Sequence, residues 1–199
     1  DGRIEPTRGE VILGKGERIS TLVQNHNEFD EYNVIDTVIM GNKELFNIIL
    51  EKDVLYSKLD FTDEDGMRAA ELEEKFANMN GWNAESDAEK LLNGLGVDKN
   101  LFTLKMSELK DSDKVKVLLA SALFGEPDVL LLDEPTNGLD VKSKMWLEEF
   151  LINFKIFSNQ LSTLDVLSIT IGSFDSFFSA IVKISFYFLF LYEQDLTNL

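Results

Sequence analysis

The chain has 199 residues, of which 36 are acidic and 19 are basic, and it contains one histidine and no cysteine. This length corresponds to one domain or slightly more. The composition excludes disulfide scaffolds, cysteine-ligated zinc sites and cysteine nucleophiles, and His26 alone cannot form a multi-histidine metal centre. The formal net charge of −17 argues against nucleic-acid binding through bulk charge, because phosphate contacts need clustered Lys and Arg.

Short strands and then helices are predicted in the first half of the chain. Residues 9–14 form an apolar run bounded by glycines, and residues 18–24 form a second candidate strand. Apolar residues at helical spacing predict three helices over 33–40, 43–55 and 64–79. A polar turn over 63–66 is expected to separate the last two helices.

The second half is predicted to contain helix, strand, turn and helix. Ser86 and Glu89 have the spacing of a capping box, which would open a helix that ends near Gly94 or Gly96. A helix over 114–124, a strand over 128–133 and a helix over 142–154 follow. A continuous apolar strand is typical of a parallel sheet covered on both faces. This order of elements predicts an α/β fold with an inserted helical subdomain.

Residues 156–199 differ in composition from the rest of the chain. They hold seven of the 15 phenylalanines, four acids and one base, so residues 1–155 carry −14 of the net charge. The apolar run 177–192 is interrupted by Lys183, and it is shorter than the roughly 20 residues of a membrane-spanning helix. We expect an apolar tail of unassigned structure here, and a buried element rather than a membrane span.

Asp133 and Glu134 are the strongest candidates for a chemical role. They end a predicted parallel strand, and ligands of α/β folds bind at the carboxyl edge of the sheet. One carboxylate can hold Mg²⁺ through water while its neighbour polarises an attacking water. The alternative is a core strand with an acidic turn, which the Pro-Thr and Leu-Asp that follow make less favourable.

The run 129–140, VLLLDEPTNGLD, resembles the ATP-binding-cassette (ABC) ATPases. Its Leu-Leu-Leu-Asp-Glu-Pro-Thr is similar to the Walker B strand, and its Asn-Gly-Leu-Asp is similar to the D-loop of the ABC-F subfamily, which comprises soluble twin-cassette proteins of translation. The resemblance covers about residues 1–155. It implies a partial cassette with a P-loop NTPase-like sheet, ATP and Mg²⁺ as cofactors, a second cassette as partner and a cytoplasmic location.

The resemblance also implies roles for individual residues. Asp133 and Gln24 would bind Mg²⁺, and Glu134 would polarise the hydrolytic water. Gln24 would also sense the γ-phosphate, and Asp140 would couple to the partner cassette.

The segment 109–113, LKDSD, stands where ABC proteins have Leu-Ser-Gly-Gly-Glu or Gln. In the family, Ser-Gly-Gly presents a hydroxyl and backbone amides to the γ-phosphate at the positive end of a helix. Asp111 and Asp113 would repel that phosphate, whereas Lys110 and Ser112 could still contact it. The resemblance therefore implies a degenerate signature, as occurs in one cassette of some ABC-F proteins.

Residues 41–100 are longer than a minimal helical subdomain and resemble the ABC-F arm, which in the family reaches towards tRNA and the ribosomal stalk. Between residues 43 and 99 there are 14 acids and 7 bases, which is a poor surface for RNA. A solvated helical hairpin with ordinary charged faces is the alternative.

Two family motifs are missing from the sequence. The phosphate-binding motif Gly-x-x-x-x-Gly-Lys-Ser/Thr does not occur. Residues 13–17, LGKGE, contain glycines and a lysine but do not have its spacing. No histidine follows Glu134, and His26 is expected to lie in a loop. We therefore expect a cassette fragment that lacks its Walker A start and is inactive alone, with residues 156–199 as a frameshifted or foreign end.

Two other functions remain open. The chain could be the nucleotide-binding domain of an ABC transporter, which would need a transmembrane partner. It could also be a degenerate remnant that acts only as a binding surface.

Overall fold

The computed structural model describes residues 17–23, 25, 27–132 and 134–158, so the predicted strand 9–14 and most of the tail lie outside the described residues. The strands of this part are β1 Ile19–Thr21 and β2 Val129–Leu131. Its α-helices are α1 Val34–Ile39, α2 Lys43–Tyr56, α3 Asp63–Asn78, α4 Ala84–Gly94, α5 Asp111–Leu123 and α6 Val141–Ser158. Three short 3₁₀ helices are η1 Gly81–Asn83, η2 Lys99–Leu101 and η3 Met106–Glu108.

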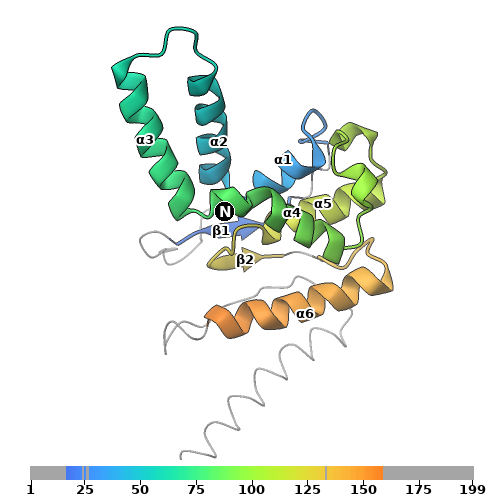
Figure 1. Cartoon of the computed structure of the whole chain (residues 1–199). Coiled ribbons are helices and arrows are strands. Elements are labelled where there is room, and N and C mark those ends of the chain that lie inside the picture. The colour runs from blue at the N-terminus through green and yellow to red at the C-terminus, as the bar shows by residue number, and fades with distance from the viewer. Residues whose placement is uncertain (1–16, 24, 26, 133, 159–199) are drawn as a thin grey trace, which may run out of the picture.

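The two strands pair in parallel and lie between helices (Figure 1). Helices α1, α4 and α5 cover one face of the pair and α6 lies on the other, while α2 and α3 form a hairpin that projects away. The helical block thus stands between the two strands in sequence, which confirms the predicted α/β fold. The most deeply buried side chains form one core: Val34, Val38, Leu45, Leu72, Leu92, Leu95, Met106, Leu119, Leu123, Leu130, Leu132 and Leu147.

Arg18 fixes the start of β1 against the ends of two helices. Its Nη1 donates to Gly41 O (3.0 Å) after α1, and its Nη2 donates to Phe124 O (2.8 Å) and Gly125 O (2.6 Å) after α5. Helix C-termini carry unsatisfied carbonyls and partial negative charge, so a guanidinium stabilises them. Burial lowers the pKa of Arg18, and the carboxylate of Asp128 opposes this shift.

The starts of α3 and α4 are capped differently from the predictions. Helix α4 begins at Ala84 because η1 leads directly into it, so Ser86 lies inside the helix and the capping box predicted there is wrong. The box lies instead at α3, where Thr62 Oγ1 accepts from Asp65 N (3.2 Å) and Thr62 N donates to Asp65 Oδ2 (3.0 Å). The predicted polar turn over 63–66 is therefore the first turn of α3.

Ion pairs join the two helices of the hairpin. Arg68 of α3 binds both carboxylate oxygens of Glu51 in α2, at 2.6 and 2.8 Å. Lys52 pairs with Glu73 at 3.0 Å, and Lys58 with Asp65 at 2.6 Å. Lys75 binds Glu71 in its own helix, so these intramolecular pairs engage four of the five bases between residues 43 and 78.

Candidate functional site

The register of the two strands brings their carboxyl ends together. Ile19 lies opposite Val129 and Thr21 opposite Leu131, and Leu22 N donates to Leu131 O at 3.1 Å. Because the strands are parallel, the chain leaves both of them at the same edge. The next predicted site residues, Gln24 and Asp133, lie outside the described residues.

Glu134 opens the turn that follows this edge. It is exposed, and its backbone has a positive φ of 45°. Its carbonyl accepts from Asn137 N at 3.0 Å, while Pro135 and Leu139 are buried. A non-glycine residue in the left-handed region costs of order 1 kcal/mol, so the surrounding turn must hold it there. Buried apolar residues on both sides of the turn provide that support.

Asp140 ends the same turn and makes two kinds of contact. Its Oδ1 accepts from Ser143 N (2.9 Å) in the first turn of α6, and its Oδ2 accepts from Lys116 Nζ (2.6 Å) of α5. The hydroxyl of Ser143 donates in turn to Leu95 O at 2.7 Å, beyond the end of α4. The hydrogen bond from Lys116, followed by that from Ser143 N, holds the pKa of Asp140 far below its ordinary value.

Lys110 and Ser112 lie at the N-terminus of α5, which begins at Asp111 rather than at residue 114 as predicted. Lys110 is the extended N-cap residue, and its carbonyl accepts from Asp113 N (2.9 Å) and Lys114 N (3.0 Å). Lys110, Asp111 and Ser112 are exposed. The amides of this first turn carry partial positive charge, but Asp111 and Asp113 offset it and weaken its attraction for an anion.

Two buried lysines of α5 were missed by the sequence analysis. Lys114 Nζ lies 2.5 Å from Asp30 Oδ1, in the loop after β1, while Lys116 binds Asp140 in the turn after β2. Both lysines stand among apolar residues of α5, which is the signal that could have revealed them, because a buried ammonium needs a carboxylate. Helix α5 therefore binds both loops that follow the two strands.

The described residues contain no group of three or more His, Cys, Asp or Glu side chains that could hold a metal ion. The expected Mg²⁺ ligands, Asp133 and Gln24, are not among these residues. In the same part of the chain, no helix is both long enough and apolar enough to cross a membrane.

Comparison with known proteins identifies relatives over most of the chain. The family model for ABC transporters matches residues 2–137, from before β1 to the turn after β2. YkpA of Bacillus subtilis, an uncharacterized ABC transporter ATP-binding protein, is 60% identical over 154 residues, or 77% of this chain and 28% of YkpA. ABC transporter F family member 4 of Arabidopsis thaliana is 33% identical over 144 residues, or 67% of this chain and 20% of that protein. The chain thus spans less than a third of each relative.

Among solved structures, the chain is similar to the ATP-binding cassette MJ0796 in a dimeric post-hydrolysis state bound to ADP and Pi. The identity is 17%, the TM-score is 0.44, and the match covers 72% of this chain and 48% of the other.

Proposed function

The chain belongs to the ABC transporter family, and we propose that it is part of an ATP-binding cassette of the ABC-F subfamily. The observation that carries the proposal is the parallel pairing of β1 with β2. This pairing brings the carboxyl ends of β1 and β2 to one edge, where the ligand of an α/β cassette binds. The relative named as an F-family member supports the choice of subfamily.

Asp133 and Gln24 would hold Mg²⁺ at this edge, because carboxylate and amide oxygens are ligands that Mg²⁺ accepts. When bound, the ion would neutralise charge on the phosphates. Glu134 would orient and polarise the attacking water. Its exposed position in a turn held by buried Pro135 and Leu139 supports this role.

Lys110, Ser112 and Asp140 would meet a partner cassette and its nucleotide. Their common attachment to α5 supports this assignment, because the helix carries the first two at its N-terminus and binds Asp140 through Lys116. A partner that contacts the N-terminus of α5 would thereby also affect the turn that holds Asp140. Asp111 and Asp113 would make the site that this segment completes weak.

The chain alone would neither bind ATP tightly nor hydrolyse it, because the sequence contains no Gly-x-x-x-x-Gly-Lys-Ser/Thr. Isothermal titration calorimetry of the purified chain with MgATP tests this proposal. We expect no saturable heat at micromolar nucleotide, and a dissociation constant in the micromolar range would contradict it.

For the whole protein we propose a cytoplasmic role in translation on the ribosome, as in the ABC-F subfamily. The hairpin itself would be a poor RNA ligand, since its ion pairs engage four of its five bases. Co-sedimentation with ribosomes tests the role in a YkpA chimera that carries the aligned residues of this chain. Failure of the chimera to sediment under conditions where YkpA does would count against it.

A further inference from the structure

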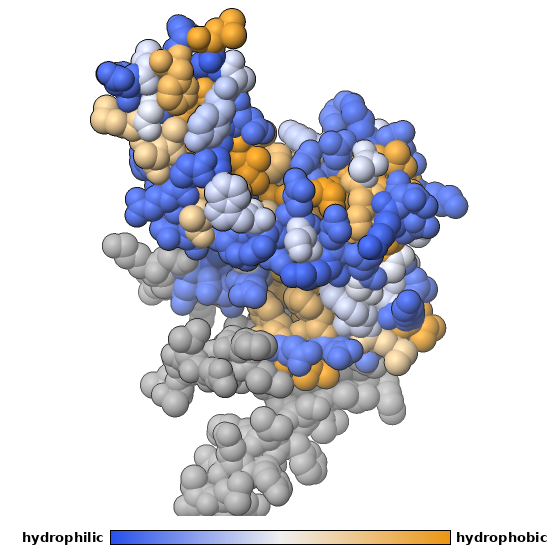
Figure 2. All heavy atoms as spheres, viewed as in Figure 1, coloured by the Kyte–Doolittle hydropathy of each residue, from blue (hydrophilic) through white to orange (hydrophobic). Residues whose placement is uncertain are grey.

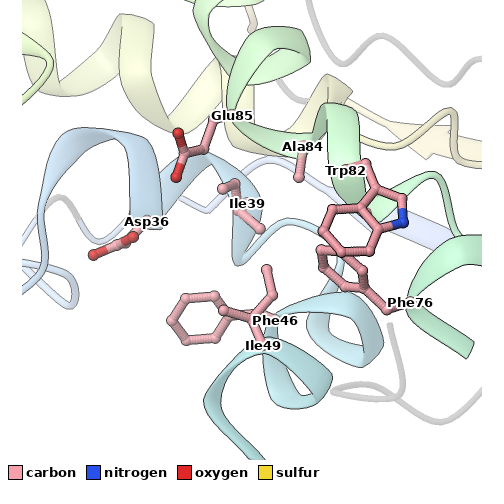
Figure 3. A pocket seen from close by; sticks show the side chains of 9 residues that line it. Asp36, Ile39, Phe46, Ile49, Phe76, Trp82, Ala84 and Glu85 are labelled. Atoms are coloured by element: carbon pink, nitrogen blue, oxygen red, sulfur yellow. The ribbon is translucent and has the colours of Figure 1, made fainter. Parts of the chain in front are cut away.

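A hollow of about 330 Å³ lies where the α2–α3 hairpin joins the rest of the helices. Helix α1 contributes Asp36 and Ile39 to its lining, and α2 contributes Phe46 and Ile49 (Figure 3). Figure 2 shows apolar surface between the hairpin and the body, with hydrophilic surface around it. The volume is at the lower end of the range for ligand pockets, and it is large enough for one long side chain of a partner.

Phe76 and Trp82 form an aromatic wall on one side of the hollow (Figure 3). The two rings meet edge to face, with centroids 5.0 Å apart and an interplanar angle of 84°. Gly81 permits this packing, because a Cβ there would lie 2.3 Å from the Phe76 ring. Trp82 is nevertheless 72% exposed, so a large part of its surface is available to a ligand.

The same rings already bind a cation. Lys52 Nζ lies 3.7 Å from the centroid of Phe76 and 5.0 Å from that of Trp82. Glu73 compensates the charge of Lys52 at 3.0 Å. The face of an aromatic ring attracts cations through its quadrupole, and tryptophan does so most strongly.

Asp36 and Glu85 give the hollow its charge. Their side chains lie across from the aromatic wall (Figure 3), and Asn33 Nδ2 donates to Asp36 Oδ2 at 3.3 Å. Among the described residues, no lysine or arginine is part of the lining, and the charge of Lys52 on the aromatic rings is compensated by Glu73. Apolar and aromatic walls beside two carboxylates are complementary to a group that is flat, apolar on its faces and positively charged.

We propose that this hollow binds an arginine side chain presented by a basic segment of a partner protein. The guanidinium would donate to the carboxylates of Asp36 and Glu85, while its methylenes would contact the apolar wall that includes Phe46 and Trp82. Arginine fits better than lysine because its planar group presents several N–H donors in a fixed geometry that can reach two carboxylates. This binding does not depend on nucleotide.

The test uses NMR titration of the full chain with the peptide acetyl-Gly-Arg-Gly-Arg-Gly-amide. The chain has two tryptophans, Trp82 and Trp146, so the two indole N–H signals are separable, and Trp82→Phe assigns them. We expect a saturable shift of the Trp82 signal and none of Trp146. A matched citrulline peptide, which is neutral and nearly the same shape, should bind about 10-fold more weakly.

The double variant Asp36→Asn/Glu85→Gln should also weaken binding about 10-fold. Glu74→Gln/Glu89→Gln is the control, because it removes two exposed acids outside the hollow and so the same net charge. Equal affinity for the citrulline peptide, equal loss in both double variants, or a parallel shift of Trp146 would overturn the proposal. A norleucine peptide that binds as tightly would show a plain apolar site and would also overturn it.

Discussion

The ammonium of Lys116 on α5 lies 2.6 Å from the carboxylate of Asp140 at the start of α6. The lysine side chain is 9% exposed and the aspartate side chain is 56% exposed. The pair joins the helix that carries Lys110 and Ser112 to the turn that begins at Glu134. This ion pair thus links the two segments that are expected to face a partner cassette.

Asp140→Asn is expected to lower the free energy of unfolding at pH 7. Asparagine can still accept from Ser143 N and cap α6, so the substitution removes chiefly the charge that compensates the buried Lys116. Urea unfolding followed by circular dichroism measures the effect. In a Lys116→Met background the same substitution should cost less, and an equal cost in both backgrounds would contradict the coupling.

The contribution of Asp140 should also depend on pH. Its pKa is lowered in the folded state, so its stabilising effect is present above the unfolded value of about 4 and is lost as pH falls through the folded value. The difference in unfolding free energy between the wild type and Asp140→Asn should therefore be constant from pH 5 to 7 and shrink below about pH 4. A difference that grows on acidification would contradict the assignment.

Two helical glycines should respond to alanine in opposite ways. A Cβ on Gly94, at the end of α4, would lie 2.0 Å from Cε2 of Trp146, so Gly94→Ala forces α6 away and should destabilise the chain by about 1–3 kcal/mol. A Cβ on Gly66, inside α3, would lie 3.8 Å from Phe61, so Gly66→Ala should stabilise by about 0.5–1 kcal/mol. Urea midpoints compare the two variants directly, and a shift of both in the same direction would contradict this packing.

The capping box of α3 predicts how Thr62 substitutions change the free energy of unfolding and at what pH the Asp65 carboxyl titrates. Thr62→Ala removes the hydroxyl that accepts from Asp65 N and should cost about 1 kcal/mol, whereas Thr62→Ser should cost less. The hydrogen bond from Lys58, followed by those from Thr62, lowers the pKa of Asp65 to about 2. Carboxyl ¹³C NMR should show this value, and Lys58→Met should raise it more than Thr62→Ala does. The reverse order would contradict the geometry.

The sequence predicted the elements well where periodicity was long. The helices over 43–55 and 64–79 are α2 and α3, and the strand over 128–133 contains β2. Both strands are shorter than predicted, because β1 and β2 pair only from Ile19 to Thr21 and from Val129 to Leu131.

Sequence motifs predicted the wrong helix start where the same motif fits both a helix cap and another structure. Ser86 and Glu89 have capping-box spacing, but the preceding η1 already starts the helix at Ala84. Thr62 and Asp65 have the same kind of spacing and do form a box. The acids and the glycine that follow Thr62 suggested a turn, although acids also stabilise the first turn of a helix.

The contacts of the candidate site could not be predicted from sequence. The motif at 129–140 indicated which residues matter, but nothing local indicated that Lys114 would bind Asp30, 84 positions away. Lysines on a helix ordinarily suggest an exposed face. Only the packing of α5 against the loops after β1 and β2 buries Lys114 and Lys116.

The most direct test of the proposed cassette is ATP hydrolysis by a YkpA chimera that carries the 154 aligned residues of this chain. Glu134→Gln in this chimera should leave MgATP binding intact and lower the turnover number by about 100-fold or more, because the carboxylate that polarises water is lost. Turnover at the rate of the unsubstituted chimera would contradict the central claim that the edge formed by β1 and β2 carries the hydrolytic chemistry.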